Sequence, residues 1–286
     1  MRKLISLLIA FLLLLGVAVA QTQEEYLDVY ISKVKPDKRA AFNAVNKKMI
    51  DANRVKGDRW IATETIYGDS TTVTFISTRQ SYADVEKGSQ AFEGAITSAY
   101  GKEGMQKLFS DFGGTVDSTR GEIRRRRWDL STAAPADAAA RTKMVGEARW
   151  LRTVMVRVRP GKSAEFETLL KDIKAAGEKA ASPSPTLVSQ AVAGHVGTVY
   201  YVTALRGSLA GFDGNPSMRE LLGDQGFQNF LKVTGDVVLN SETVINRFVP
   251  ELSNPPDEVA AAAPDFWRPK AAPSTTPAKP KANTKK

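Results

Sequence analysis

Residues 34–42 read VKPDKRAAF, and residues 158–166 read VRPGKSAEF. Two further matches keep a similar spacing of about 125 residues: TVTFIS at 72–77 returns as TVYYVT at 198–203, and DLS at 129–131 returns as ELS at 251–253. Self-similarity at a fixed spacing has to be settled first, because each copy then represents one structural unit. The chain is therefore predicted to consist of two related halves.

Each half shows, in order, the periodicity of a strand, a helix, two strands, a second helix and a last strand. The first helix of each half should follow Pro36 or Pro160, where apolar positions fall on one helical face. The predicted strands lie at residues 26–34, 60–67, 71–78 and 122–128, and again at 150–158, 187–193, 198–203 and 244–250. The second helices are expected over 81–112 and 216–234, the former divided into several short helices by glycines at 88, 94, 101 and 104.

The order β-α-β-β-α-β within about 105 residues is that of the ferredoxin-like split motif, a four-stranded antiparallel sheet with both helices on one face. If the other face of the sheet were exposed to water, polar and apolar residues would alternate cleanly along each strand. The strand that contains Val73, Phe75 and Ile76 instead has apolar residues on both faces. Both faces are thus expected to be buried. We predict an α+β fold of two tandem ferredoxin-like units packed sheet to sheet within one chain, with the first unit at 21–131, a linker at 132–146 and the second unit at 147–253.

On its element order, its duplication and the V-x-P-x-K-x-x-x-F entry to each first helix, the chain resembles the dimeric α/β-barrel superfamily. This superfamily includes antibiotic-biosynthesis monooxygenase-like, haem-degrading and stress-responsive barrel proteins. The resemblance covers residues 26–253 apart from the linker and includes no catalytic signature. In the superfamily two such units, usually from two chains, enclose a small-molecule cavity. The resemblance therefore implies an intrachain pseudo-dimeric barrel.

The N-terminus has the pattern of an export signal, in which Met1-Arg2-Lys3 precedes an uncharged, leucine-rich run that ends at the small residues Ala18 and Ala20. An uncleaved membrane anchor is the alternative, because about 17 apolar residues is the lower limit for crossing a bilayer. We predict a signal peptide at residues 1–20. Its removal would leave a periplasmic or secreted protein without a membrane span.

The C-terminal segment 254–286 is rich in proline, alanine and lysine, and we expect it to be disordered because it offers little apolar surface to bury. Its one aromatic island, DFWRP at 265–269, could instead dock on the barrel or on a partner. The neighbouring lysines could contact an anionic surface of the cell envelope.

The formal net charge of +9 is not concentrated in the folded body. Two positive charges lie in the signal and three net positive charges lie in the tail, so about +4 remains for the two units. So small an excess, in a protein expected to be exported, argues against a nucleic-acid partner. The absence of cysteine excludes disulfides, thiolate metal sites and cysteine nucleophiles.

The run Arg124-Arg125-Arg126-Arg127 lies in the last strand of the first half, where alternation sends successive side chains to opposite faces. Aligning the two halves places Arg125 opposite Arg247. These two arginines could form a guanidinium pair at the barrel interface that holds a carboxylate or phosphate. The alternative is that they form structural salt bridges near a strand end.

Aromatic residues on the hairpins, chiefly Trp60 and Tyr201, are candidates for contact with a ligand, although core packing is the alternative. Glu64 could be a general base only if it were buried beside an arginine, and we expect it to be exposed. His195 is the only histidine, and its place in the turn GHVG at 194–197 predicts a solvated side chain. We therefore predict no catalytic residue, no metal site and no cofactor.

The function favoured by these observations is an exported protein that binds a small, partly apolar or anionic molecule through Arg125, Arg247, Trp60 and Tyr201. Two alternatives remain. One is a cofactor-independent, monooxygenase-like enzyme acting on a small aromatic substrate. The other is a structural or interaction protein of the cell envelope.

Overall fold

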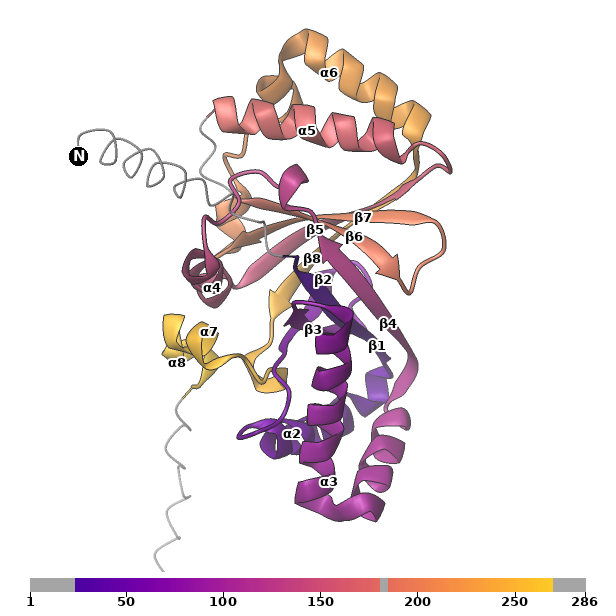
Figure 1. Ribbon diagram of the computed structural model, residues 1–286, viewed down its shortest axis with the longest axis vertical. Coiled ribbons are helices and arrows are strands. Elements are labelled where there is room, and N and C mark those ends of the chain that lie inside the picture. The colour runs from indigo at the N-terminus through magenta and orange to yellow at the C-terminus, as the bar shows by residue number, and fades with distance from the viewer. Residues whose placement is uncertain (1–23, 181–184, 270–286) are drawn as a thin grey trace, which may run out of the picture.

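The computed structural model describes residues 24–180 and 185–269, and within these residues eight strands close into one barrel (Figure 1). The predicted signal peptide at residues 1–20 lies outside the described residues. Hydrogen-bonded neighbours around the barrel follow the order β1-β3-β2-β8-β5-β7-β6-β4. In this part of the chain, no helix combines the length and the apolarity that crossing a bilayer requires.

The first half supplies four consecutive strands of the barrel in the order β4-β1-β3-β2. Each of these strands is antiparallel to its neighbour. Two helices, α2 and α3, connect the strands. The elements are β1 (Tyr26–Val34), α2 (Arg39–Asn53), β2 (Ile61–Tyr67), β3 (Thr72–Arg79), α3 (Tyr82–Gly113) and β4 (Val116–Arg126).

The second half repeats this arrangement with the strand order β8-β5-β7-β6. Its elements are β5 (Trp150–Val158), α5 (Ser163–Lys179), β6 (Thr186–Ala193), β7 (Thr198–Arg206), α6 (Met218–Val237) and β8 (Val238–Phe248). Short 3₁₀ turns follow β1, β4, β7 and β8, namely η2 (Pro36–Lys38), η3 (Trp128–Leu130), η4 (Leu209–Phe212) and η5 (Pro250–Leu252).

The two four-stranded sheets meet along their edges rather than only face to face. β2 pairs with β8, with Glu64 opposite Arg247, and β4 pairs with β6, with Arg125 opposite Gln190. These two seams satisfy the backbone groups that an open sheet would leave unpaired. Because the barrel is closed, the inner faces of all its strands surround one common interior.

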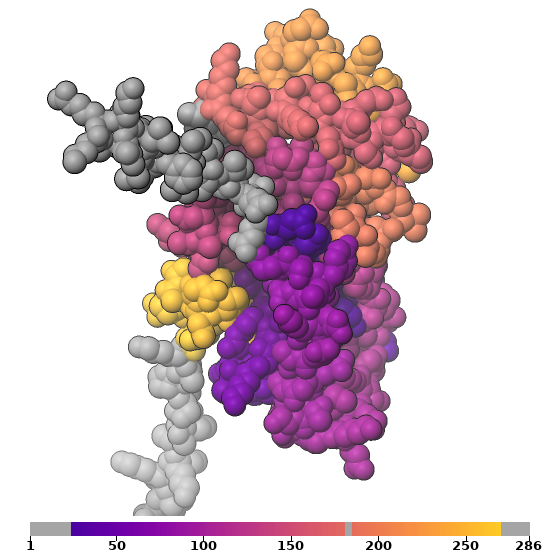
Figure 2. All heavy atoms as spheres, in the orientation of Figure 1, coloured from indigo at the N-terminus to yellow at the C-terminus, as the bar shows by residue number. Residues whose placement is uncertain are grey.

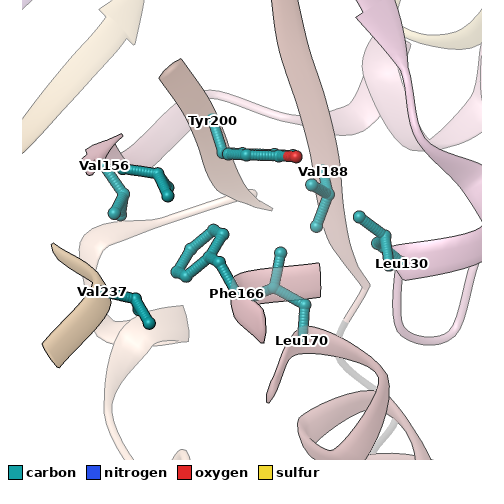
Figure 3. Packing of buried hydrophobic residues seen from close by; sticks show 8 residues of the cluster. Leu130, Val156, Phe166, Leu170, Val188, Tyr200 and Val237 are labelled. Carbon is teal, nitrogen blue, oxygen red and sulfur yellow. The ribbon is translucent and has the colours of Figure 1, made fainter. Parts of the chain in front are cut away.

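Helices cover the outer face of each half, with α2 and α3 on one side of the barrel and α5 and α6 on the other (Figure 1). In the second half Phe166 of α5 packs on Tyr200 of β7, with ring centroids 5.0 Å apart (Figure 3). In the first half Phe42 of α2 packs on Phe75 of β3 at 6.3 Å. The phenylalanine of the repeated helix entry therefore anchors the core beneath each helix pair.

The second helix of each half bends at one glycine. In α3 the break is at Gly101, with φ 72° and ψ 172°, and in α6 it is at Gly223, with φ 69° and ψ 172°. Residues that carry a Cβ rarely adopt these backbone conformations. The expected breaks at positions 88, 94 and 104 do not occur, because these glycines lie within the helical arms of α3.

The linker and the first part of the tail are structured, which differs from the expectation of a disordered segment from residue 254. The linker contains α4 (Ala138–Glu147), and the tail forms α7 (Asp257–Ala262) and α8 (Pro264–Trp267). Trp267 is only 3% exposed, donates from its indole Nε1 to the Gly146 carbonyl at 2.8 Å and packs edge-on against Phe248. In Figure 2 the yellow tail helices lie against the body of the molecule. The aromatic island at residues 265–269 therefore buries apolar surface, although the overall composition of the tail suggested that it had little to bury.

Candidate ligand site inside the barrel

The barrel encloses a cavity of about 440 Å³, which is within the range of small-ligand pockets. Every strand contributes side chains to its lining, alternating along each strand as the pleat requires. The lining mixes aliphatic side chains, a belt of threonines and a few charged groups. A molecule bound here would meet both apolar surface and hydrogen-bond partners.

One end of the cavity is apolar and closed. Its walls are formed by Ile61, Leu151, Leu205 and Phe248, and Val145 of α4 covers them. These residues belong to the same cluster as Trp267, so the linker and the tail together seal this end of the barrel. The segments outside the repeated units therefore shape the cavity.

The opposite end carries charged side chains. Lys33 near the end of β1 forms an ion pair of 2.8 Å with Asp69 in the β2–β3 turn, and both side chains are about half exposed. Arg120 and Glu242 line the cavity near them. This end of the cavity is therefore polar and partly exposed.

Arg124 and Arg126 extend from β4 into the cavity and are nearly buried. Arg124 donates from Nε and Nη2 to one carboxylate oxygen of Glu122, at 2.8 and 2.7 Å. Arg126 donates from Nε to Glu25 at 3.2 Å. The lining therefore presents two guanidinium groups, two residues apart on one strand.

Glu122 is the centre of a buried polar cluster beside the cavity. Its side chain has no exposed surface and lies 2.6 Å from Arg120, 2.7 Å from the Tyr201 hydroxyl and 2.9 Å from His195 Nε2. Burial favours a raised pKa for Glu122, but Arg124, Tyr201 and His195 outweigh it and the pKa is lowered. Glu122 is therefore an anion that neutralises the arginines.

The other members of this cluster are also held tightly. The Arg124 guanidinium lies 3.5 Å from the centre of the Tyr201 ring, and the Tyr201 hydroxyl lies 2.7 Å from His195 Nε2. Burial is the main cause of the lowered pKa of His195 and of the raised pKa of Tyr201. Both side chains are therefore neutral near pH 7.

The charges on the inner face of β4 and its neighbours do not balance. Glu122 is shared by Arg120 and Arg124, and Glu25 is shared by Arg126 and by Arg141 of α4, at 3.2 and 3.6 Å. Four guanidinium groups thus share two carboxylates. The Lys33–Asp69 pair and Glu242 stand at the polar end, away from Arg126. The cavity wall at Arg124 and Arg126 keeps a positive potential that favours an anion.

The two arginines proposed from the sequence do not line this cavity. The register confirms their equivalence, since Arg125 stands opposite Tyr26 in β1 and Arg247 stands opposite Trp150 in β5. Arg247, however, forms an ion pair with Glu64 at 2.5 Å on the outer side of the barrel. Strand alternation correctly places Arg124 and Arg126 on one face and Arg125 on the other. The prediction chose Arg125 because it is equivalent to Arg247, and both of these arginines lie on the outer face.

The two aromatic candidates lie on different sides of the sheet. Tyr201 belongs to the buried cluster around Glu122. Trp60 is buried on the helix side, donates from Nε1 to the Leu252 carbonyl at 2.9 Å and packs edge-on against Phe92. Only Tyr201 is therefore close to the cavity, which it reaches through Arg124.

Two other expectations about charged residues were wrong. The His195 side chain is 6% exposed rather than solvated, because the turn folds over Glu122. The Glu64 side chain is buried rather than exposed, between Arg39 and Arg247. Although burial raises the pKa of Glu64, these two arginines lower it overall, so Glu64 is an ion-pair partner and a poor general base.

The described residues give no fit for a haem iron or a bound metal. His195 uses Nε2 within the cluster and is not among the residues that line the cavity. Within residues 24–180 and 185–269, no three His, Asp or Glu side chains gather in a geometry that would hold a metal ion. The cavity lining offers guanidinium groups, threonine hydroxyls and apolar walls.

No family model matches the sequence, and no curated protein matches it. Among solved structures, an anthrone oxidase-like protein is 14% identical and superposes with a TM-score of 0.51 over 80% of this chain and 93% of that chain. A chlorite dismutase from Candidatus Nitrospira defluvii is 10% identical, with a TM-score of 0.41 over 83% and 94% of the two chains. A haem-binding protein from Thermus thermophilus is also 10% identical, with a TM-score of 0.41 over 80% and 92%. The likeness to the first of these, with the closed barrel, shows that the chain has the dimeric α/β-barrel fold.

Proposed function

We propose that the barrel binds one small amphipathic anion per chain. The observation that carries this proposal is an interior cavity of about 440 Å³ in which two arginines face aliphatic walls. Buried arginines without full compensation by carboxylates are costly, and an anionic ligand would offset that cost. A barrel with a purely structural role would be expected to fill its interior instead.

The geometry indicates how such a ligand would lie. Its apolar body would occupy the closed end near Leu151 and Phe248, where burial of apolar area provides affinity. Its anionic group would meet Arg126, whose Nε is paired with Glu25 and whose two Nη atoms have no hydrogen-bond partner among the described residues. A carboxylate or sulfonate matches this donor arrangement.

The test is a fluorescence titration with 8-anilinonaphthalene-1-sulfonate and with N-phenyl-1-naphthylamine, which lacks the sulfonate. Arg126→Met should weaken binding of the sulfonate by about 10-fold to 100-fold, the worth of a charge-assisted hydrogen bond. Binding of the uncharged probe should change little. Arg125→Met, one residue away but outside the cavity lining, is the matched control and should bind both probes like the parent protein. Equal sulfonate binding by the parent and Arg126→Met would refute the proposal.

A second candidate is a cofactor-independent oxidation of a small aromatic substrate. The buried Glu122, Tyr201 and His195 cluster adjoins the cavity through Arg124, and the name of the anthrone oxidase-like neighbour suggests a first substrate to test. Oxygen uptake in the presence of anthrone, above the rate without protein, would support this candidate. Uptake equal to that rate would leave binding as the function.

We also infer that the halves arose by tandem duplication of one ferredoxin-like unit. The matching register of Arg125 and Arg247, the matching bends at Gly101 and Gly223 and the repeated helix entry all support this inference. Export through the signal at residues 1–20 and a periplasmic or secreted location remain part of the proposal.

A further inference from the structure

A second cavity, of about 610 Å³, lies on the outer side of the first half, between β1 and β3 and the helices α2 and α3. We call it the α3 groove. It lies on the opposite face of these strands from the barrel interior, because its strand residues alternate with those that face the barrel cavity, apart from Thr119, which lines both. Six aromatic residues line it: Tyr30, Trp60, Phe75, Phe92, Phe109 and Phe112.

Three of these rings form a continuous wall. The centroids of Trp60 and Phe92 are 5.7 Å apart with the planes at 72°, and those of Phe92 and Phe109 are 6.4 Å apart with nearly parallel planes. Aromatic faces carry negative electrostatic potential and attract cations that lie within about 6 Å. A wall of this kind favours an apolar or a cationic occupant.

The charged residues in the groove decide between these two. Asp28, Asp58 and Glu93 line it, and Arg79 is the only cationic side chain among the described residues that do so. Arg79 binds Asp58 through both terminal nitrogens, at 2.7 and 2.6 Å, and reaches Asp28 only at 3.3 Å. The groove lining therefore has one guanidinium and three carboxylates, and burial raises the pKa of Asp28. A cation beside Asp28 would complete the neutralisation.

Arg79 is held tightly in the wall of the groove. The residue is 7% exposed, and its Nε is buried without a hydrogen-bond acceptor among the described residues. Its guanidinium lies against Gly88 of α3, where a Cβ would come within 2.3 Å. The guanidinium is therefore fixed in the wall of the groove, closer to Asp58 than to Asp28.

The second half lacks these features at the equivalent positions. The register places Arg152 where the first half has Asp28, and Arg206 where it has Arg79. Burial and the neighbouring Arg152 both lower the pKa of Arg206, which shows that this region is basic. The acidic charge of the groove is thus specific to the first half.

We propose that the α3 groove binds an organic cation, a quaternary or aromatic ammonium compound. The ammonium group lies between Asp28 and the ring wall formed by Trp60, Phe92 and Phe109. This site is independent of the anion site proposed inside the barrel.

The test uses choline phenyl ether as the probe and 3,3-dimethylbutyl phenyl ether as its uncharged isostere, with binding followed by isothermal titration and by tryptophan fluorescence. Asp28→Asn keeps the shape and leaves Arg79 paired with Asp58, and it should weaken binding of the cation by about tenfold. Binding of the isostere should not change. Asp172→Asn in α5, an exposed position in the other half, makes the same charge change outside the groove and should have no effect.

A second variant keeps the proposal testable if Asp28→Asn does not fold. Phe92→Leu removes one ring of the wall and should weaken binding of the cation more than binding of the isostere. Arg126→Met should leave the affinity for choline phenyl ether unchanged, which separates this site from the barrel cavity. The proposal is overturned if Asp28→Asn binds the cation as tightly as the parent protein, or if the isostere binds as tightly as the cation.

Discussion

The Glu122 carboxylate is the common partner of the polar side chains around the inner face of β4. Arg120 and Arg124, together with His195 and Tyr201, all reach its carboxylate, although the side chain has no exposed surface. Breaking a buried ion pair by removing one partner is much more costly than breaking an exposed one. The inner face of β4 can carry several arginines because this carboxylate lies among them.

His195 gives a prediction about pH, because it is the only histidine in the chain and it is buried. Burial lowers its pKa in the folded state below the ordinary value of about 6.5. As the pH falls below 6.5, the unfolded chain binds a proton that the folded chain does not, so stability should be lost. Urea unfolding at pH 7.5 and 5.5 measures this loss, which should be smaller for His195→Asn. An identical loss in both proteins would contradict the assignment.

The arginine run also shows what the sequence reveals about the site and what it does not. Alternation along a strand separates Arg124 and Arg126 from Arg125 without any structure. It does not tell which pair faces the cavity, because both faces of this strand are covered, one by helices and one by the barrel. His195 was mispredicted for a related reason, since a turn in the sequence carries no sign that it folds over a buried carboxylate.

At the scale of elements, the strands with the strongest apolar pattern were the best predicted. β1 and β5 have the bounds expected from the sequence, because each is followed closely by a proline that ends it. β4 and β8 begin about six residues earlier than expected. Their first residues, such as Ser118 and Thr119, have no apolar alternation and become strand only by pairing with β1 or β5.

The bend in α3 gives a prediction that uses two glycines of one helix. Gly101→Ala should destabilise the protein by about 1–3 kcal/mol, because alanine is strained at φ 72° and ψ 172°. Gly94→Ala should stabilise it by about 0.5–1 kcal/mol, because Gly94 is helical and a Cβ there would meet nothing within 4 Å. Urea unfolding of both variants measures the difference. Equal effects would mean that the bend is not needed.

At the scale of the whole molecule, the segments outside the repeat contribute to the closed end of the barrel. A duplication signal identifies the two halves, but α4, α7 and α8 belong to neither copy. Their role follows from long-range contacts such as that of Trp267 with Gly146, which no local pattern reveals. The closed end of the cavity was therefore the part of the site that the sequence could least predict.

Removal of the tail tests this arrangement. Deleting residues 254–286 should lower the free energy of unfolding by at least about 3 kcal/mol, because Trp267 and Val259 lose their buried surroundings. A chain that ends at residue 269 keeps these contacts and should unfold like the full-length protein. Thermal and urea unfolding of both truncated chains provide the measurement. An unchanged stability after the longer deletion would show that the tail helices do not support the barrel.

The barrel closes through two seams within a single polypeptide, and this has a consequence for how its halves can change over time. In a barrel assembled from two identical subunits, every substitution is copied by symmetry into both. Here a mutation in one half leaves the other untouched, so an acidic groove on one side can coexist with a basic surface at the matching place on the other. The two halves can therefore specialise separately while they share one interior.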